Sequence, residues 1–150
     1  MKIRTATPDD IPFLIQLERN STTAAHWTEE QYKDLLRDGA GARRLVLLAQ
    51  GEDAVLLGFL VAQHIAIEWE LENIVVSSTE RRKGIGGRLL RALMDAAGQS
   101  ASESVFLEVR ESNHPARRFY QKTGFQHAGV RKGYYRDPPE DAILYRLQLR

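Results

Sequence analysis

The chain has 150 residues, no cysteine, 27% charged residues and a formal net charge of +1 at pH 7. This length fits one domain with a substantial core, and the near-neutral charge gives no general reason to expect nucleic-acid or membrane binding. The lack of cysteine excludes disulfide bonds, thiolate metal sites and a cysteine nucleophile. Because no apolar run reaches membrane-spanning length and the N-terminus has no apolar leader core, we expect a cytoplasmic protein.

The N-terminal stretch predicts a strand followed by a helix. Residues 3–6 read as a short first strand. Thr7 suits a helix N-cap, Pro8 suits the first helical position, and the acidic residues that follow suit the first turn. Apolar residues at helical spacing then predict a helix that continues to about Arg19.

A second, shorter helix is predicted after a polar loop at residues 20–26. The segment Thr28–Gln31 has the spacing of a capping box, in which a Thr and a Gln side chain satisfy each other's backbone groups. The helix should continue to Leu36, and Gly39 and Gly41 should end it.

Three strands are predicted next, and they form an antiparallel meander. Arg44–Gln50 is followed by a turn at Gly51–Asp53 and by a second strand over Ala54–Ala66. The third strand runs from Trp69 to Val76 and ends in the β-branched residues Ile74, Val75 and Val76.

A basic, glycine-rich loop connects this strand to the most amphipathic helix of the chain. The loop Arg81–Gly87 is followed by apolar residues at every fourth position, which predicts a helix from the glycines to about Ala97. Glycines let the backbone approach a ligand, and a helix N-terminus favours negative charge. The sequence therefore favours a phosphate or pyrophosphate site, with an ordinary glycine turn and a solvated charge run as the alternative. Neither the Walker nor the Rossmann glycine pattern is present.

The C-terminal third predicts a strand, a helix and a closing hairpin. Ser104–Arg110 can lie parallel to the preceding strand because a helix crosses between them. Asn113 caps a helix that runs to Lys122, with Pro115 in its first turn, and Gly124 follows as a left-handed cap. The hairpin comprises strands Phe125–Tyr135 and Ala142–Leu149, joined by the turn Asp137–Pro139.

This order of elements, together with two motifs, resembles the GNAT superfamily of N-acetyltransferases. Residues 81–86 follow the pattern R-x-x-G-x-G, and residues 107–125 resemble the segment L-x-V-x-x-x-N-x-x-A-x-x-x-Y-x-x-x-G-F. Within the superfamily the chain looks like the bacterial ribosomal-protein-alanine N-acetyltransferases (RimI type), on the segments HWTEEQY at 26–32, LENIVV at 71–76, LEVRESN at 107–113 and GVRKGYYRDPPEDAILYRL at 129–147. The resemblance spans nearly the whole chain.

The resemblance implies one α+β domain over residues 1–150. Its central sheet would be mixed and mostly antiparallel, with about seven strands and about four helices. A coenzyme A cleft would lie between the two central parallel strands, and acetyl-CoA would be the co-substrate without any metal. The implied cofactor-binding residues are Ile74, Val75, Val76, Arg81, Arg82, Lys83, Gly84, Ile85, Gly86, Gly87 and Asn113. In this set the Val76 amide polarises the thioester carbonyl and Asn113 lies near the pantetheine.

Glu108 is the candidate general base. It stands in the otherwise apolar run Val105–Val109, so it is either partly buried or faces a cleft, and burial raises the pKa of a carboxyl group. An ion pair with an arginine on a neighbouring strand is the equal alternative on the residues alone. The resemblance favours the base, acting through water.

Tyr120 is the candidate general acid. A phenol near its ordinary pKa of about 10 is protonated at neutral pH and can donate to a thiolate. The alternative is a core aromatic, since Phe119 adjoins it and Phe125 follows. The resemblance places this tyrosine at the coenzyme sulfur.

The remaining polar and aromatic candidates carry less information. Arg117 and Arg118 meet coenzyme phosphate or form a solvated helix face. The four histidines share no metal-ligand spacing, so no metal is expected. Gly133 stands where this subfamily often has a side-chain amide, which leaves the acceptor open. The residues that either line an acceptor groove or only pack are Trp27, Trp69, Arg110, Tyr134 and Tyr135.

The expected function is therefore acetyl transfer from acetyl-CoA to the N-terminal amine of a protein, and the subfamily implies the alanine of a ribosomal protein. The amine would attack directly in a ternary complex. The alternatives are a small amine or lysine side chain as acceptor, and a non-catalytic module that binds acyl-CoA for regulation. We expect no nucleic-acid or membrane partner, and a monomer or a weak homodimer.

Overall fold

The structure is a computed structural model that describes residues 1–20, 27–37 and 43–149. Within that part of the chain one seven-stranded sheet has the order β1-β2-β3-β4-β5-β7-β6. The strands are β1 (Lys2–Thr5), β2 (Arg44–Gln50), β3 (Leu56–Ile65), β4 (Glu68–Val76), β5 (Ser104–Arg110), β6 (Gln126–Arg136) and β7 (Pro139–Gln148). The α-helices are α1 (Ile11–Arg19), α2 (Glu29–Leu35), α3 (Ile85–Gln99) and α4 (His114–Lys122).

The predicted fold class and order of elements are confirmed. The neighbouring pair β4 and β5 is parallel, and the other five neighbouring pairs are antiparallel. The crossover helix between β4 and β5 is α3, as the sequence indicated. Local capping signals are also confirmed: Thr28 Oγ1 accepts from the Gln31 amide at 3.2 Å, and Asn113 Oδ1 accepts from the Ala116 amide at 3.3 Å.

Several predicted boundaries are wrong by a few residues. Residues Pro8–Asp10 form a separate 3₁₀ helix before α1, and the Thr7 amide donates to the Asp10 carboxylate at 2.8 Å as the cap of this first turn. Strand β7 begins at Pro139 instead of Ala142, since a first strand residue needs no amide donor. Strand β3 spans Leu56–Ile65 because a 3₁₀ turn occupies residues 52–54. The predicted loop at 21–26 and the glycines 39 and 41 lie outside the described residues.

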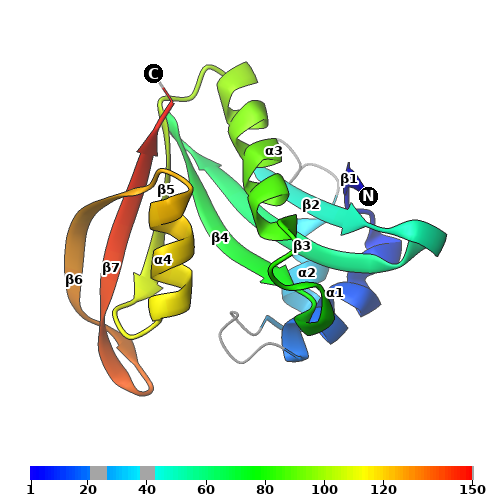
Figure 1. Ribbon diagram of the computed structural model, residues 1–150, viewed down its shortest axis with the longest axis horizontal. Coiled ribbons are helices and arrows are strands. Elements are labelled where there is room, and N and C mark those ends of the chain that lie inside the picture. The colour runs from blue at the N-terminus through cyan, green and yellow to red at the C-terminus, as the bar shows by residue number, and fades with distance from the viewer. Residues whose placement is uncertain (21–26, 38–42, 150) are drawn as a thin grey trace.

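Two layers of helices cover the sheet, one on each face. Helices α3 and α4 lie on the face toward the viewer in Figure 1, and α1 and α2 lie behind β2 and β3. We call these the α3/α4 face and the α1/α2 face. Each face has its own buried apolar cluster, and each fully buried large apolar side chain contributes roughly 1.5–3 kcal/mol.

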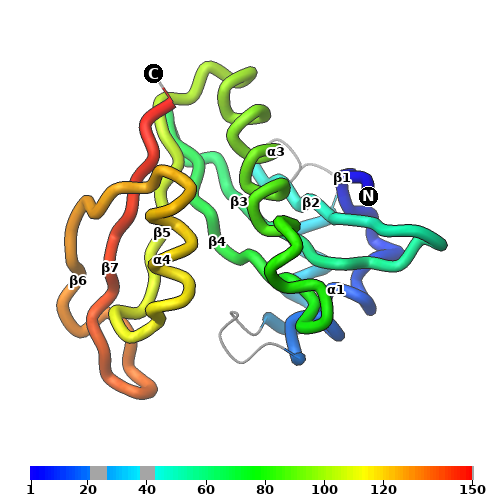
Figure 2. The backbone as a smooth tube through the Cα atoms, viewed as in Figure 1, coloured from blue at the N-terminus to red at the C-terminus, as the bar shows by residue number. Residues whose placement is uncertain are grey.

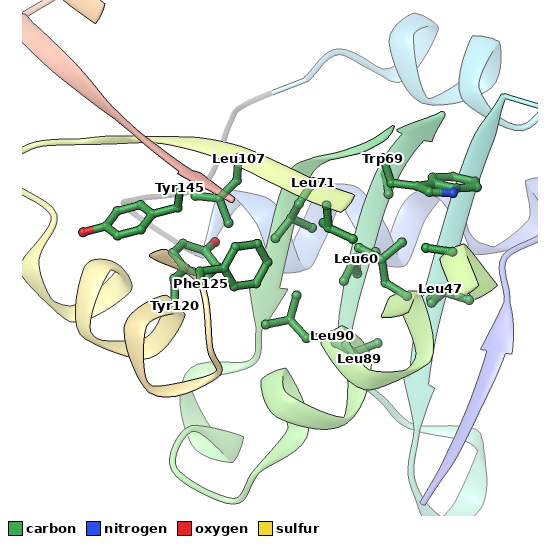
Figure 3. Close-up of a cluster of buried hydrophobic side chains, with 14 of the residues drawn as sticks. Leu47, Leu60, Trp69, Leu71, Leu89, Leu90, Leu107, Tyr120, Phe125 and Tyr145 are labelled. Atoms are coloured by element: carbon green, nitrogen blue, oxygen red, sulfur yellow. The ribbon is translucent and has the colours of Figure 1, made fainter. Parts of the chain in front are cut away.

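The cluster on the α3/α4 face joins two groups of side chains. Figure 3 shows Tyr120 and Phe125 beside Leu107 of β5, with Leu60 and Leu89 among the aliphatic side chains at the other end of the cluster. The helix α3 stripe predicted from the sequence supplies Leu89 and its neighbours, which are fully buried. This packing fixes the positions of α3 and α4 relative to the central strands.

A β-bulge in β4 reverses which side chains face which layer. Leu71 pairs with Ala62 and Asn73 pairs with Val61, so Glu72 is an extra residue. Before the bulge Leu71 belongs to the α3/α4 cluster, and after it Val75 belongs to the α1/α2 cluster. The sequence analysis treated β4 as regular and missed this bulge.

The parallel pair β4 and β5 stays together for only three residue pairs. These are Glu68 with Ser104, Trp69 with Val105, and Glu70 with Phe106. Beyond them the two strands diverge, which Figure 1 and the backbone trace of Figure 2 both show. At the closed end, Glu68 accepts from Arg146 Nε of β7 at 2.8 Å and from the Ser104 hydroxyl, and it ties three strands together.

Gly58 of β3 marks the tightest backbone contact near the divergence. A Cβ atom there would lie 2.7 Å from the Val75 carbonyl oxygen and 3.3 Å from the Val76 Cα. Gly58→Ala should therefore lower the free energy of unfolding by about 1–3 kcal/mol, because backbone atoms cannot yield as a side chain can. Urea unfolding measures the change. Gly98→Ala on α3, where the new methyl meets nothing within 4 Å, is the control and should not destabilise.

An unchanged unfolding free energy for Gly58→Ala would show that β3 and the end of β4 can separate without cost. The contact between these two strands would then not hold the start of α3 in place.

Candidate active site

The loop before α3 has the geometry of an anion site. Gly84 has φ +81° and serves as the N-cap, so helix α3 begins at Ile85. The first amides of a helix have no intrahelical acceptor, and the helix dipole favours an anion there. A Cβ at Gly84 or Gly87 would meet nothing within 4 Å, which leaves the loop backbone open to a ligand.

Gly86 differs from these two glycines because it lies in close contact with α4. A Cβ there would lie 3.1 Å from the Phe119 ring of α4 and 3.8 Å from the Val76 side chain. The absence of a side chain at Gly86 therefore lets α4 pack against the start of α3 and the end of β4. This close approach brings together the loop, β4 and α4, which are distant in sequence.

The end of β4 presents unpaired backbone toward β5. Pairing with β5 stops at Glu70, whereas pairing with β3 continues to Val76. Strand pairing therefore covers residues 74–76 of β4 on the β3 side and does not extend to them on the β5 side. An extended ligand can add to such an edge as a strand would.

Tyr120 points into the apolar cluster from the middle of α4. Tyr120 is 8% exposed. Its ring centroid lies 5.7 Å from that of Phe125, in an edge-on arrangement, and 5.4 Å from that of Phe119, in a tilted one. Burial, with a smaller effect of the nearby Tyr135, raises the pKa of the Tyr120 phenol above its ordinary value. The phenol is therefore protonated at neutral pH and can act as a proton donor.

Glu108 lies on the α1/α2 face of β5, opposite the tyrosine's side of the sheet. Its side chain is 14% exposed, and its Oε1 lies 2.9 Å from Nε of Arg131 on β6. The ion pair that the sequence left as one alternative is thus present. The Tyr134 phenol is a second hydrogen-bonding neighbour of this carboxylate.

Two further glutamates lie near Glu108 and were not singled out from the sequence. Glu70 and Glu72 on β4 both have raised pKa values, mainly because burial disfavours their charged forms. The charges of Glu72 and Glu108 add to the shift at Glu70, whereas Arg44 opposes it at Glu72. The signal in the sequence was a run of glutamates at alternate positions, 68, 70 and 72, in a strand whose other residues are apolar except Asn73.

A hollow of about 460 Å³ lies between α2 and the sheet, and of Glu70, Glu72 and Glu108 it is Glu72 that lines it. Its floor includes Gln63, which pairs in register with Glu70, and Glu72 itself. Trp27 forms part of its wall, and this tryptophan also packs edge-tilted against Tyr32 at 5.6 Å. The lining residues are Trp27, Gln31, Asp34, Leu35, Arg43, Arg44, Gln63 and Glu72.

The other aromatic and basic candidates divide between packing and the site. Trp69 is 7% exposed and stacks on His64, so it belongs to the core. Arg110 pairs with Glu140 and lies 4.2 Å over the Tyr135 ring, which braces the β6–β7 hairpin.

Of the remaining two candidates, Tyr134 lies at the site and Arg117 has a packing role. Tyr134 is 51% exposed, and the charge of Glu108 is the main cause of its raised pKa. Arg117 donates to the Tyr145 hydroxyl at 3.1 Å and therefore fastens α4 to β7.

The described part of the chain holds neither a cluster of metal ligands nor a membrane-spanning helix. In residues 1–20, 27–37 and 43–149 no group of three or more His, Asp or Glu side chains is placed to hold a metal ion. Over the same ranges no helix is both long and apolar enough to cross a membrane.

Comparisons with known proteins agree with this geometry. Residues 11–125 match the acetyltransferase (GNAT) family. The chain is 31% identical over 142 residues to the ribosomal protein bS18-alanine N-acetyltransferase of Escherichia coli strain K12, covering 93% of this chain and 92% of that protein. It is 30% identical over 153 residues to the enzyme of the same name from Haemophilus ducreyi, covering 98% and 99%. The crystal structure of the ribosomal-protein-S18-alanine N-acetyltransferase from Escherichia coli superposes with a TM-score of 0.85 at 29% identity, covering 99% and 93%.

Proposed function

The chain belongs to the GNAT family of acetyltransferases, and we propose that its acceptor is the α-amine at the N-terminus of a protein. It is an acetyl-CoA-dependent N-acetyltransferase, as the family and its full-length relatives indicate. The relatives' names specify the alanine of ribosomal protein bS18, and the same acceptor is our first candidate here. Such an acceptor would place the enzyme in the cytoplasm.

The observation that carries this proposal is the opening between β4 and β5, which has a different chemistry on each face of the sheet. On the α3/α4 face it adjoins the glycine loop and the Tyr120 phenol. On the α1/α2 face it adjoins the carboxylates of Glu70 and Glu108. On the same face Glu72 lines the hollow between α2 and the sheet, which would take the residues that follow an N-terminus. A thioester can enter from one face and a cationic amine from the other.

The glycine loop and the end of β4 would hold the co-substrate. Main-chain amides of residues 83–87 would bind the pyrophosphate, with Arg81 and Arg82 adding positive charge. The unpaired edge of Ile74–Val76 would pair with the pantetheine, and the Asn113 amide would lie near it. The Val76 amide would polarise the thioester carbonyl, a role that hydrogen-bond donors at a developing oxyanion perform in general.

The chemistry requires three proton transfers around one nucleophilic attack. Glu108, directly or through one water, takes a proton from the acceptor ammonium, and the free amine then attacks the thioester carbonyl. The C–S bond breaks as the new C–N bond is completed, and Tyr120 donates its proton to the departing thiolate. A second proton leaves the amide nitrogen and restores the Tyr120 phenol, so the net products are the acetylated amine, the free thiol and one proton.

Two other functions remain as alternatives with defined tests. A small amine or a lysine side chain would use the same opening without the hollow beside α2. A non-catalytic module would bind acyl-CoA but transfer nothing to any amine.

The first prediction concerns the acceptor. Thiol release from acetyl-CoA should be seen with short peptides that carry a free N-terminal Ala, and it should vanish when the same peptides are blocked at the N-terminus. Peptides beginning with Ser or Met, a lysine peptide with a blocked N-terminus, and spermidine complete the panel. Turnover with only the lysine peptide or spermidine would contradict the proposed acceptor and retain the enzyme class.

The second prediction concerns the base. Glu108→Gln should lower turnover by roughly 100-fold or more, because a positioned general base typically contributes at least that factor. The acidic limb of the pH–rate profile should shift, while acetyl-CoA binding measured by calorimetry should stay near the wild-type value. An unchanged rate across the pH range would remove Glu108 from the mechanism.

The third prediction concerns the acid. Tyr120→Phe retains the buried ring, so the protein should fold with a thermal midpoint close to that of the wild type. Turnover should nevertheless fall by roughly 100-fold, because the phenol proton is no longer available to the thiolate. The raised pKa of Tyr120 predicts that this donor remains protonated through neutral and mildly alkaline pH. A wild-type rate for Tyr120→Phe would assign the tyrosine to the core alone.

A further inference from the structure

The sheet carries five glutamates, all on strands β4, β5 and β7. Four of them have an arginine partner. The pairs are Glu68 with Arg146 at 2.8 Å, Glu72 with Arg44 at 2.5 Å, Glu108 with Arg131 at 2.9 Å and Glu140 with Arg110 at 3.2 Å. Within the described ranges Glu70 is the fifth glutamate, and it has neither an ion pair nor a hydrogen bond through its carboxylate. Arg44 and Arg131 act on it through their charges alone, without a hydrogen bond.

Glu70 also occupies a singular position in the sheet. It is the last residue of β4 that pairs with β5, opposite Phe106, so it stands where the two strands begin to diverge. Side chains alternate along a strand, and Leu71 faces the α3/α4 cluster, so Glu70 faces the α1/α2 side. Glu108 lies two residues beyond Phe106 on the same face of β5. The two carboxylates therefore lie on the acceptor side of the opening, one on each strand.

A partly buried carboxylate without a cation partner is costly, and proteins usually neutralise such a group with a basic side chain. This sheet does so at four glutamates and leaves one without a partner, at the point where a substrate amine would arrive. The raised pKa of Glu70 reflects the same imbalance, since burial and two negative neighbours outweigh the charges of the two arginines. A cation bound beside Glu70 would stabilise the charged form of its carboxylate.

We propose that Glu70 binds the α-ammonium group of the acceptor and holds it beside Glu108 for deprotonation. This inference rests on the proposed function and deepens it, because it assigns recognition of the charged amine to Glu70 and proton removal to Glu108. Glu70 is then a specificity residue, one that distinguishes a free N-terminus from a blocked or uncharged one before any chemistry occurs.

The separate tasks predict different kinetic signatures. Glu70→Gln should raise the KM for a free-Ala peptide by about tenfold or more, since a charge-assisted contact of this kind is lost. Its kcat should fall much less than that of Glu108→Gln, and its KM for acetyl-CoA should be unchanged. The rise in KM should be larger at pH 7 than at pH 9, because the free α-amino group has a pKa of about 8 and loses its positive charge over that interval.

A binding experiment without turnover isolates the recognition step. The enzyme is saturated with free CoA, and calorimetry compares a free-Ala peptide with the same peptide in which propionyl replaces alanine and removes the amine. At pH 6.5 the wild type should prefer the charged peptide by about tenfold, and Glu70→Gln should bind both peptides equally. Glu103→Gln, which removes an exposed carboxylate before β5, is the matched control and should keep the preference.

Folding of the variant has its own readout. Removal of an unpaired carboxylate should leave the thermal midpoint of Glu70→Gln equal to or above that of the wild type. Glu70→Asp keeps the charge and should retain a weaker preference, so it tests the proposal even if the glutamine variant is unstable.

The outcomes separate this inference from the proposed function. If the wild type acetylates the free-Ala peptide and Glu70→Gln keeps the tenfold preference, the role of Glu70 is wrong and the function stands. If the wild type acetylates only lysine or spermidine, the proposed acceptor is wrong, and the same comparison with that amine and its des-amino analogue decides the role of Glu70. If no amine is acetylated, both are wrong.

Discussion

The divergence of β4 from β5 is the constraint on which the rest of the structure depends. Glu68, held by Arg146 and Ser104, keeps the two strands together at one end, and pairing stops at Glu70. The Glu72 bulge then turns the end of β4. Since a parallel pair needs a crossover, α3 must begin beside this opening, and its N-terminal glycine loop lies there as a consequence.

The two faces of the sheet differ in chemical character around this opening. The α3/α4 face is apolar, and it holds Tyr120 in a setting that keeps the phenol protonated. The α1/α2 face is apolar under α1 and α2 but carries carboxylates where β4 and β5 separate. Paired arginines offset the cost of most of these buried charges, which confines net negative charge to a small region beside Glu70.

Contacts between residues close in the sequence were predictable from it, whereas contacts between residues far apart in the sequence were less predictable. The Thr28 capping box and the Asn113 cap involve residues three apart, so short motifs specify them. The parallel pairing of β4 and β5 followed from the helix between them. The bulge was missed, although apolar positions shift from odd numbers at Trp69 and Leu71 to even numbers at Ile74 and Val76.

The sequence by itself determined the family, the order of strands and helices, the glycine loop and the two candidates Glu108 and Tyr120, because each depends on local pattern or on residue type. Only the tertiary structure decided which carboxylates are neutralised. Arg131 reaches Glu108 across β7, and Arg44 reaches Glu72 from β2, so neither pairing has a local signature. Glu70 has no ion pair because Arg44 binds Glu72 and Arg131 binds Glu108. This distribution of partners is set by the folded sheet.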